Sequence, residues 1–266
     1  MTMLKLIKGI GVILLVIYVL GCAFLYITQD DIIFRPTPLD EQTHYRWGQE
    51  VYIDVEEDVQ LHGLYHQTPD AQGAILYLHG NRGNTRWCQR QAESFDSYDM
   101  DVLLIDYRGY GKSDGEIESL AQLETDMDHV YEWLKSRHPG QPMWVAGYSL
   151  GSGLASYLAD KFESQSLILV APYVSIEAMK DDIMPIIPDF LVKYPLDNMS
   201  HLENYQGSVA IFHGTEDEVI PYDHSEQLHA RHADKVRLVT LQDVGHRRAI
   251  FHPSISTYLK ELAKTR

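Results

Sequence analysis

The segment from Gly147 to Gly151, which reads Gly-Tyr-Ser-Leu-Gly, constrains the fold of this chain more than any other feature. It directly follows the apolar run Met143 to Ala146, and residues 152–159 behind it are typical of a helix. A chain that changes from strand to helix so abruptly makes a tight turn, in which side chains two positions either side of the serine would clash. The two glycines therefore predict a strained turn that lifts the hydroxyl of Ser149 above the edge of a sheet.

Short apolar runs recur along the chain and predict the other strands of that sheet. Runs of this length without alternation are typical of buried parallel strands. Helical patterns lie between them, the clearest at 117–134, where apolar residues at three- and four-residue spacing form one stripe. The alternation predicts an α/β fold with a mostly parallel central sheet and helices on both faces, preceded by an antiparallel pair at 51–55 and 61–65. The runs are Ala74 to Leu78, Val102 to Ile105, Met143 to Ala146, Leu167 to Val170, Val209 to Phe212 and Val236 to Leu241.

A serine in such a turn becomes a nucleophile with the help of a base and an orienting acid, which follow it in the order acid, histidine. Asp217 comes shortly after the run that ends at Phe212, and His246 shortly after the run that ends at Leu241. We predict that His246 accepts the Ser149 proton during attack on a carbonyl and returns it to the leaving group, while Asp217 fixes the imidazole tautomer. This is the chemistry of a serine hydrolase, to which an ester, a thioester and an amide are all suited.

Three other carboxylates stand close to these residues in the sequence. Glu216 and Glu218 flank Asp217, and spacing alone does not show which of the three side chains points toward His246. Asp243 lies three residues before His246 and is interpreted as a turn residue of the loop. We favour Asp217 as the orienting acid.

An acyl-transfer site also needs backbone N–H groups that stabilise the negative charge developing on the carbonyl oxygen. The residue after the nucleophile, here Leu150, supplies one such group, and a loop after an earlier strand supplies the second. Residues 79–84, which read His-Gly-Asn-Arg-Gly-Asn, follow an apolar run and are predicted to form that loop, with Asn81 as the second donor. His79 is interpreted as a residue that supports the loop rather than as a base.

The composition argues against several other classes of protein. The chain carries 22 Lys and Arg against 38 Asp and Glu, a net charge of −16, which disfavours nucleic acid as a partner. With Cys22 inside an apolar stretch and Cys88 as its sole companion, neither a disulfide framework nor a cysteine zinc site is available. His224, His229 and His232 lack the spacing of a metal site and are interpreted as surface residues. The sequence therefore implies no metal and no cofactor.

Residues 9–27 form an uncharged stretch that is typical of a membrane-spanning helix. At about 1.5 Å per residue it would reach roughly 28 Å, close to the ~30 Å thickness of the hydrocarbon core. Lys5 and Lys8 precede it, and Asp30 and Asp31 follow it. Because positive charge favours the cytoplasmic side, we expect a single-pass anchor with a cytoplasmic N-terminus and a catalytic domain outside the cytoplasm, in the periplasm if the source is a bacterium.

Two other kinds of N-terminal segment compete with an anchor. Residues 19–22 loosely resemble the pattern that precedes a lipidated cysteine, here Cys22, and a cleaved secretory signal has a similar apolar core. However, the apolar run continues through 23–27, where a lipoprotein becomes polar, and no small-residue cleavage site precedes Asp30. We therefore predict an uncleaved anchor at 1–29, a juxtamembrane connection at 30–46 and a catalytic domain at 47–266.

With these residues assembled, the chain resembles the α/β-hydrolase superfamily and, within it, the single-pass, N-terminally anchored α/β-hydrolase domain proteins. The resemblance covers nearly the whole chain and implies an α/β-hydrolase fold with a small lid inserted at about 172–205. The motifs that carry it are Gln29 to Pro36, His79 to Asn84, Asp106 to Ser113, the turn around Ser149, His213 to Pro221, and Gly245 with His246.

The resemblance also implies the surroundings of the site. The loop 106–113 would border it, with Tyr110 as a wall of the pocket and Arg108 in a buried ion pair. The lid is rich in apolar residues, of which Met184 and Ile187 are expected to contact the substrate, with ordinary packing onto the sheet as the alternative. Together with the anchor, an apolar lid favours lipidic or acylated substrates met at the bilayer surface.

Two functions compete with that of a carboxylic ester hydrolase. A serine peptidase shares the fold and the order of the triad, but such enzymes usually carry a larger gating domain than residues 171–205 provide. A non-catalytic binding protein that kept the fold is the other alternative. A complete triad and both oxyanion elements argue against it.

Overall fold

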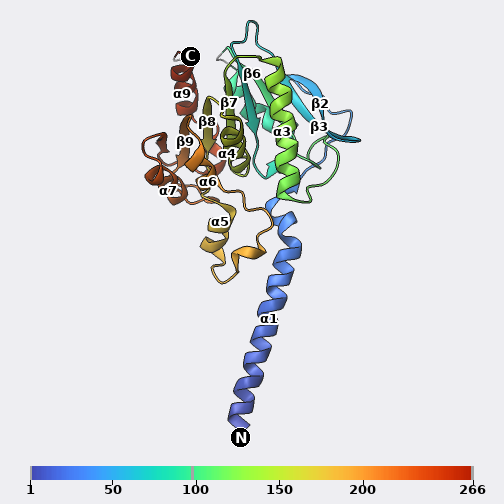
Figure 1. Ribbon diagram of the computed structural model, residues 1–266, viewed down its shortest axis with the longest axis vertical. Coiled ribbons are helices and arrows are strands. Elements are labelled where there is room, and N and C mark those ends of the chain that lie inside the picture. The colour runs from blue at the N-terminus through green and yellow to red at the C-terminus, as the bar shows by residue number, and fades with distance from the viewer. Residues whose placement is uncertain (1, 97–98, 265–266) are drawn as a thin grey trace.

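A computed structural model describes residues 2–96 and 99–264, and its centre is an eight-stranded sheet in the order β10-β9-β8-β7-β4-β6-β3-β2 (Figure 1). Neighbours from β10 to β6 run parallel, whereas β3 pairs antiparallel with both β6 and β2. The strands are β2 (Gln49–Glu56), β3 (Val59–His66), β4 (Ala74–Leu78), β6 (Asp101–Ile105), β7 (Met143–Tyr148), β8 (Ser166–Val170), β9 (Ser208–Gly214) and β10 (Val236–Leu241). The predicted central strands and the antiparallel pair are thereby confirmed.

The helices of the described residues are α1 (Thr2–Ile33), α2 (Thr85–Ala92), α3 (Leu120–Arg137), α4 (Gly151–Phe162), α5 (Ile176–Ile183), α6 (Asn198–Asn204), α7 (Asp223–Arg231), α8 (His246–Ala249) and α9 (Pro253–Ala263), with short 3-10 helices η1 (Glu93–Phe95) and η2 (Asp189–Leu191). On one face of the sheet, Met127 of α3 and Leu154 of α4 belong to one buried apolar cluster. On the other face, Cys88 of α2 and Leu259 of α9 belong to a second. Helices therefore cover both faces, as the alternating pattern predicts.

α1 projects from this domain (Figure 1). It has 32 residues, about 48 Å of helix, and ends at Ile33 rather than at residue 29. The segment Met3–Ile33 is long and apolar enough to cross a membrane. Length and composition thus fit a single-pass membrane anchor.

Directly after α1 the chain is tied to the predicted oxyanion loop. The short strand β1 (Arg35–Pro36) pairs parallel with β5 (Arg82–Gly83). The Arg35 N–H also donates to the carbonyl oxygen of Asn81 (3.1 Å). The end of the anchor helix is therefore held close to that loop.

A buried ion pair joins the loop after β6 to α3, as the resemblance implies for Arg108. Its Nε and Nη2 donate to the two oxygens of Asp126 at 2.6 and 2.7 Å, and the side chains are 6% and 1% exposed. A guanidinium left at such a site without its carboxylate keeps its desolvation penalty and loses most of its compensation. Glu56, at 3.0 Å from Arg108, is mostly exposed and compensates little.

Asp126→Ala is therefore expected to lower the free energy of unfolding by about 3 kcal/mol. Urea denaturation of the full chain in detergent, followed by circular dichroism, measures the change. Glu261→Ala is the matched control, because it breaks an ion pair with Arg237 in which both side chains are more than half exposed, and under ~1 kcal/mol is expected. Equal losses for the two variants would contradict the prediction.

Candidate active site

Ser149 lies in the turn between β7 and α4. Its φ of 54° is a left-handed conformation that non-glycine residues rarely adopt, and its backbone N–H donates to the carbonyl oxygen of Val170 (3.0 Å). A side chain at Gly147 would collide with the backbone at Ser152, and one at Gly151 with the carbonyl oxygen of Leu78. The structure therefore has the strained turn predicted from the sequence, and the turn requires both glycines.

The structure brings Ser149, His246 and Asp217 together from the ends of three strands. Nε2 of His246 lies 3.0 Å from Oγ of Ser149, and Nδ1 lies 2.7 Å from Oδ2 of Asp217. The other oxygen of Asp217 accepts hydrogen bonds from the backbone N–H groups of Val219 (2.9 Å) and Ile220 (2.8 Å). In this geometry an Nδ1–H donates to the carboxylate, so that Nε2 is left to accept the serine proton.

His213, at the end of β9, also contacts the Asp217 carboxylate, and sequence reasoning assigned it no role. Its Nε2 lies 3.2 Å from Oδ2 of Asp217 and 3.0 Å from the carbonyl oxygen of Ile220, while Nδ1 lies 2.6 Å from Oγ of Ser225. Nε2 of His213 therefore carries a proton, and Nδ1 accepts a hydrogen bond from the hydroxyl of Ser225. The available sequence signal was a histidine directly after an apolar run and four residues before the acid.

The pKa of Asp217 lies well below its ordinary value. Burial alone would raise it, but hydrogen bonds from His213 and His246, the charge of His246 and the backbone N–H of Ile220 together outweigh burial. The carboxylate is thus ionised throughout the neutral range. It can hold the imidazole in one tautomer and stabilise its charged form.

The neighbouring carboxylates lie elsewhere. Glu218 is exposed, and its Oε2 accepts a hydrogen bond from the backbone N–H of His246 (3.1 Å) rather than from the ring. Glu216 is exposed. Asp243 is exposed and has a φ of 56°, which fits the turn residue that the sequence predicts. Of the four candidate carboxylates, Asp217 is the one whose oxygens reach the imidazole of His246.

The two predicted oxyanion donors lie beside the serine. Asn81 and Leu150 line the same cavity as Ser149. Among the described residues, neither backbone N–H donates a hydrogen bond to another protein group. Leu150 also stands at the N-terminus of α4, where the helix dipole favours negative charge.

Tyr110 lies behind the loop of Asn81 and not in the lining of the cavity, where the resemblance places it. The side chain is fully buried, and its hydroxyl donates to the carbonyl oxygen of Asn81 (3.0 Å) and accepts from the N–H of Arg35 (2.9 Å). Tyr107 similarly donates to the carbonyl oxygen of His79 (2.8 Å). These bonds hold the carbonyl oxygens of Asn81 and His79 against the tyrosine hydroxyls of the loop 106–113.

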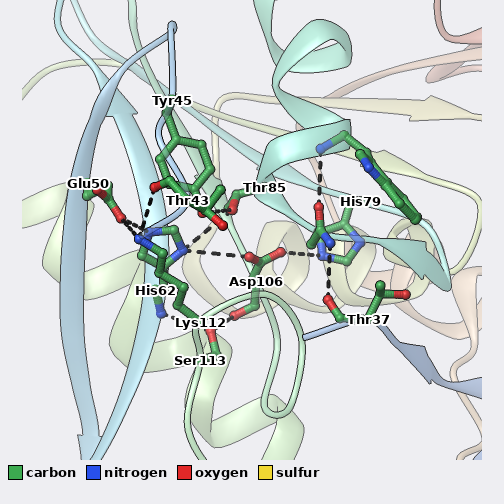
Figure 2. A network of polar contacts seen from close by, with 12 residues as sticks. Thr37, Thr43, Tyr45, Glu50, His62, His79, Thr85, Asp106, Lys112 and Ser113 are labelled. Carbon is green, nitrogen blue, oxygen red and sulfur yellow. Dashed lines mark hydrogen bonds and ion pairs between the residues drawn. The ribbon is translucent and has the colours of Figure 1, made fainter. Parts of the chain in front are cut away.

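A buried charged network lies behind this loop. Figure 2 shows the carboxylate of Asp106 between the rings of His62 and His79, at 3.6 and 3.4 Å. His62 continues to Glu50 (3.1 Å), which also pairs with Lys112 (2.5 Å). Asp106 and both histidines are fully buried. The network therefore connects the edge strand β2 and its neighbour β3 to the loop that carries Asn81.

The network makes stability depend on pH. Burial alone would raise the pKa of Asp106, but contacts with His62 and His79 and the backbone N–H of Thr85 outweigh it and hold the pKa below its ordinary value. Its stabilising contribution is therefore fully present above the unfolded pKa, near ~3.9, and is lost as pH falls through the folded value.

We expect Asp106→Asn to cost about 2 kcal/mol of unfolding free energy at pH 7 and progressively less below about pH 4. Urea titrations of both proteins at several pH values test this expectation. A deficit that did not change with pH would contradict it.

A cavity of about 280 Å³ opens at Ser149. Met184 and Ile187 lie in its lining, together with other residues of the lid. The C-terminal turns of α1 form an additional wall that sequence reasoning missed. The apolar lining residues are Leu25, Tyr26, Ile32, Ile33, Leu150, Tyr173, Ile176, Met179, Ile183, Met184, Ile187, Leu191, Val192, Val219 and Ile220, and the polar ones are Gln29, Asn81, Ser149 and Lys180.

In the described part of the chain, no group of three or more His, Cys, Asp or Glu side chains is arranged to hold a metal ion. His224 and His232 are buried, which corrects the surface position expected from the sequence, and His229 is half-buried. Nε2 of His224 pairs with Asp182 (2.8 Å), and Nδ1 of His229 lies 2.8 Å from the carbonyl oxygen of Val236.

Proteins that place a serine at a strand-to-helix turn of such a sheet, within reach of a histidine and an acid, are serine hydrolases. Comparisons with known proteins agree. The sequence model of the serine aminopeptidase S33 family matches residues 69–196. An uncharacterized protein of Mycobacterium tuberculosis is 30% identical over 206 residues, which cover 75% of this chain and 72% of that protein. The lysophosphatidylserine lipase ABHD12 of Xenopus tropicalis is 30% identical over 220 residues, which cover 67% of this chain and 56% of the lipase.

Solved structures share the fold. An esterase of Pyrococcus furiosus superimposes with a TM-score of 0.69 at 18% identity, over 88% of this chain and 98% of that one. Est1E of Butyrivibrio proteoclasticus, solved with ferulic acid bound, superimposes with a TM-score of 0.65 at 21% identity, over 81% of this chain and 98% of that one. The chain belongs to the α/β-hydrolase superfamily, and within it to the serine ester hydrolases.

Proposed function

We propose that this chain cleaves carboxylic acyl esters or thioesters through an acyl-enzyme intermediate, with Ser149 as nucleophile, His246 as base and Asp217 as orienting acid. The carrying observation is the pair of contacts at His246, 3.0 Å to Oγ of Ser149 and 2.7 Å to Oδ2 of Asp217. Both distances are within hydrogen-bond reach, as general base catalysis requires.

In the proposed reaction, Oγ of Ser149 attacks the carbonyl carbon as its proton passes to Nε2 of His246. The carbonyl oxygen becomes an oxyanion, which the N–H groups of Asn81 and Leu150 stabilise. His246 then gives the proton to the leaving alkoxide or thiolate, and the acyl group remains on Ser149. Water repeats the sequence with His246 as base and releases the acid.

We infer that the acyl part of the substrate is an apolar chain. The cavity at Ser149 is lined mostly by aliphatic side chains, and Lys180 is the one charged residue among the described residues that line it. An apolar cavity with few polar groups favours a hydrocarbon ligand. The lysophosphatidylserine lipases among the relatives support a lipidic substrate.

We further propose the placement of the domains. Lys5 and Lys8 before the apolar segment favour a cytoplasmic N-terminus, with the catalytic domain of 47–266 on the other side of the membrane and 172–205 as its lid. Fusion of a reporter enzyme to either terminus distinguishes the two orientations. Activity of a cytoplasmic reporter at the C-terminus would overturn this placement.

A peptidase is the second candidate, because the matching family model carries an aminopeptidase description. An aminopeptidase must bind a free ammonium group, for which a carboxylate in the pocket is the usual partner. The described lining of the cavity includes Lys180 and no Asp or Glu. A positive charge at Lys180 would repel the ammonium group of a peptide, so the lining favours the ester hydrolase.

The test is hydrolysis of p-nitrophenyl esters of graded acyl length by the full chain, with aminoacyl p-nitroanilides in parallel. Turnover of medium or long acyl esters, together with fluorophosphonate labelling that Ser149→Ala abolishes, is the expected result. Absence of both turnover and labelling would overturn the catalytic proposal. Preferential cleavage of the anilides would favour the peptidase.

A further inference from the structure

The lid carries exposed apolar side chains outside the lining of the cavity. Ile186 is 72% exposed and Phe190 is 82% exposed, and neither residue lines the cavity at Ser149. Ile183, at the end of α5, borders the cavity and is also 72% exposed. Clustered apolar exposure of this kind marks a surface that contacts another apolar phase.

Hydrogen bonds hold the lid along the membrane helix. The hydroxyl of Tyr18 donates to the carbonyl oxygen of Ile186 (2.8 Å), and Nε2 of Gln29 donates to the carbonyl oxygen of Leu191 (2.9 Å). The later residue of the lid is thus bonded to the later residue of α1, so the two segments run side by side in the same direction. Residues 186–191 therefore lie beside the part of α1 between positions 18 and 29, as Figure 1 shows for the region around α5.

These contacts set the depth of the lid. If residues 9–27 occupy the hydrocarbon core, Tyr18 lies nine residues inside its boundary at Ile27, which is about 14 Å along the helix. The whole core is ~30 Å thick, so this depth corresponds to about one leaflet. Ile186, bonded to Tyr18, then lies within that leaflet. Lys193 pairs with Asp30 (2.7 Å) at the boundary.

The backbone of the lid is suited to such a place. Irregular backbone is tolerated at membrane depth where its polar groups find partners in the protein. The carbonyl oxygens of Ile186 and Leu191 accept from α1, and that of Ile187 accepts from Nζ of Lys180 (2.7 Å). Pro185 and Pro188 have no N–H to satisfy.

Charged side chains next to residues 183–191 are paired. Lys180 lies 2.5 Å from both Asp181 and Asp189, and Asp182 lies 2.8 Å from His224. Pairing reduces the cost of holding these groups near hydrocarbon. It leaves Ile183, Ile186 and Phe190 as the exposed large apolar side chains of the lid.

We propose that residues 183–191 lie in the membrane leaflet beside α1, and that the enzyme takes the acyl chain of an amphiphilic lipid ester directly from that leaflet into the cavity between α1 and the lid. The inference about the substrate rests on the proposed function, whereas the inference about the lid does not. The cavity runs from Ser149 and Ile33 to Leu25 and Tyr26, which places its far end deeper along the helix. The anchor is thus a wall of the substrate site as well as a tether.

The position of the lid is tested without any measurement of activity. Phe190→Trp, in the full chain reconstituted into phosphatidylcholine vesicles, places an indole at the exposed lid position. Vesicles with bromine on the acyl chains quench a tryptophan that lies in the hydrocarbon. We expect Phe190→Trp to show a clear additional quenched component over the wild type, which has four tryptophans.

Tyr52→Trp is the matched control, because Tyr52 is an aromatic residue 44% exposed on β2, away from the lid. It should show no more quenching by brominated lipid than the wild type. Equal quenching for the two variants would overturn the proposal. Protection of the new indole from both brominated lipid and aqueous acrylamide would also overturn it, because a second protein copy would then cover the lid.

Activity tests the uptake of substrate from the leaflet. Ile186→Asp adds a charge outside the cavity and is expected to lower turnover of a long-chain lysophospholipid in vesicles at least tenfold, with hydrolysis of a short soluble ester unchanged. Ile186→Leu should retain both activities. Unchanged vesicle activity in Ile186→Asp would overturn uptake from the leaflet, and absence of both activities in the wild type would instead overturn the proposed function.

Discussion

Ser149→Ala is expected to lower kcat for an acyl ester by a factor on the order of 10⁶, with the fold retained. The substitution removes the atom that forms the acyl-enzyme, and His246 then has no nucleophile to deprotonate. The turn itself imposes little obstacle to alanine, since its strain lies in the backbone and both glycines remain. The measurement is p-nitrophenyl ester hydrolysis by the full chain, beside a urea unfolding curve.

Ser136→Ala provides the matched control for this prediction. Ser136 is an exposed serine near the C-terminal end of α3, and its hydroxyl donates to the carbonyl oxygen of Trp133 (2.8 Å). α3 ends before β7 begins, whereas Ser149 follows the end of β7. Its replacement should leave kcat within a few-fold of the wild type. Retention of substantial Ser149-independent turnover in Ser149→Ala would show that another nucleophile or a bound water carries the reaction.

Much of the fold was accessible from the sequence because the local patterns agree with the tertiary structure. The buried strands read as continuous apolar runs, since helices cover both faces of the sheet. The turn at Ser149 was predictable for a steric reason, namely that Gly147 and Gly151 stand where any side chain would collide with backbone. Asp217 and His246 were located by their order after the apolar runs that form β9 and β10, and the structure brings them into contact.

Contacts between segments far apart in the chain were not accessible in this way. The α1 wall of the cavity depends on how the helix leaves the domain, and an apolar membrane segment has the same sequence whether or not it packs on a lid. Tyr110 illustrates the same limit. Its hydroxyl is hydrogen-bonded to the backbone of Asn81 and Arg35, and the ring therefore lies behind the loop. The contact between His213 and Asp217 was missed because the sequence around a histidine at a strand end does not indicate which residue it contacts.

Asp217→Asn is expected to lower kcat by a factor on the order of 10⁴ while leaving the fold intact. The N–H groups of Val219 and Ile220 hold one oxygen of the side chain, so the amide oxygen of asparagine takes that place. The amide nitrogen then faces His246, and two N–H donors cannot share a hydrogen bond. The imidazole must turn to the tautomer whose Nε2 bears the proton, which cannot accept one from Ser149.

Glu218→Gln separates this effect from a general loss of negative charge near His246. The amide oxygen of glutamine can still accept the backbone N–H of His246, which Glu218 now does at 3.1 Å, and no ring nitrogen is involved. Activity within about threefold of the wild type is therefore expected. If Glu218→Gln lost as much activity as Asp217→Asn, the orienting acid would be misassigned, and the tautomer argument would fail. A large loss confined to Asp217→Asn identifies the ring contact, rather than the surrounding field, as the source of the base's activity.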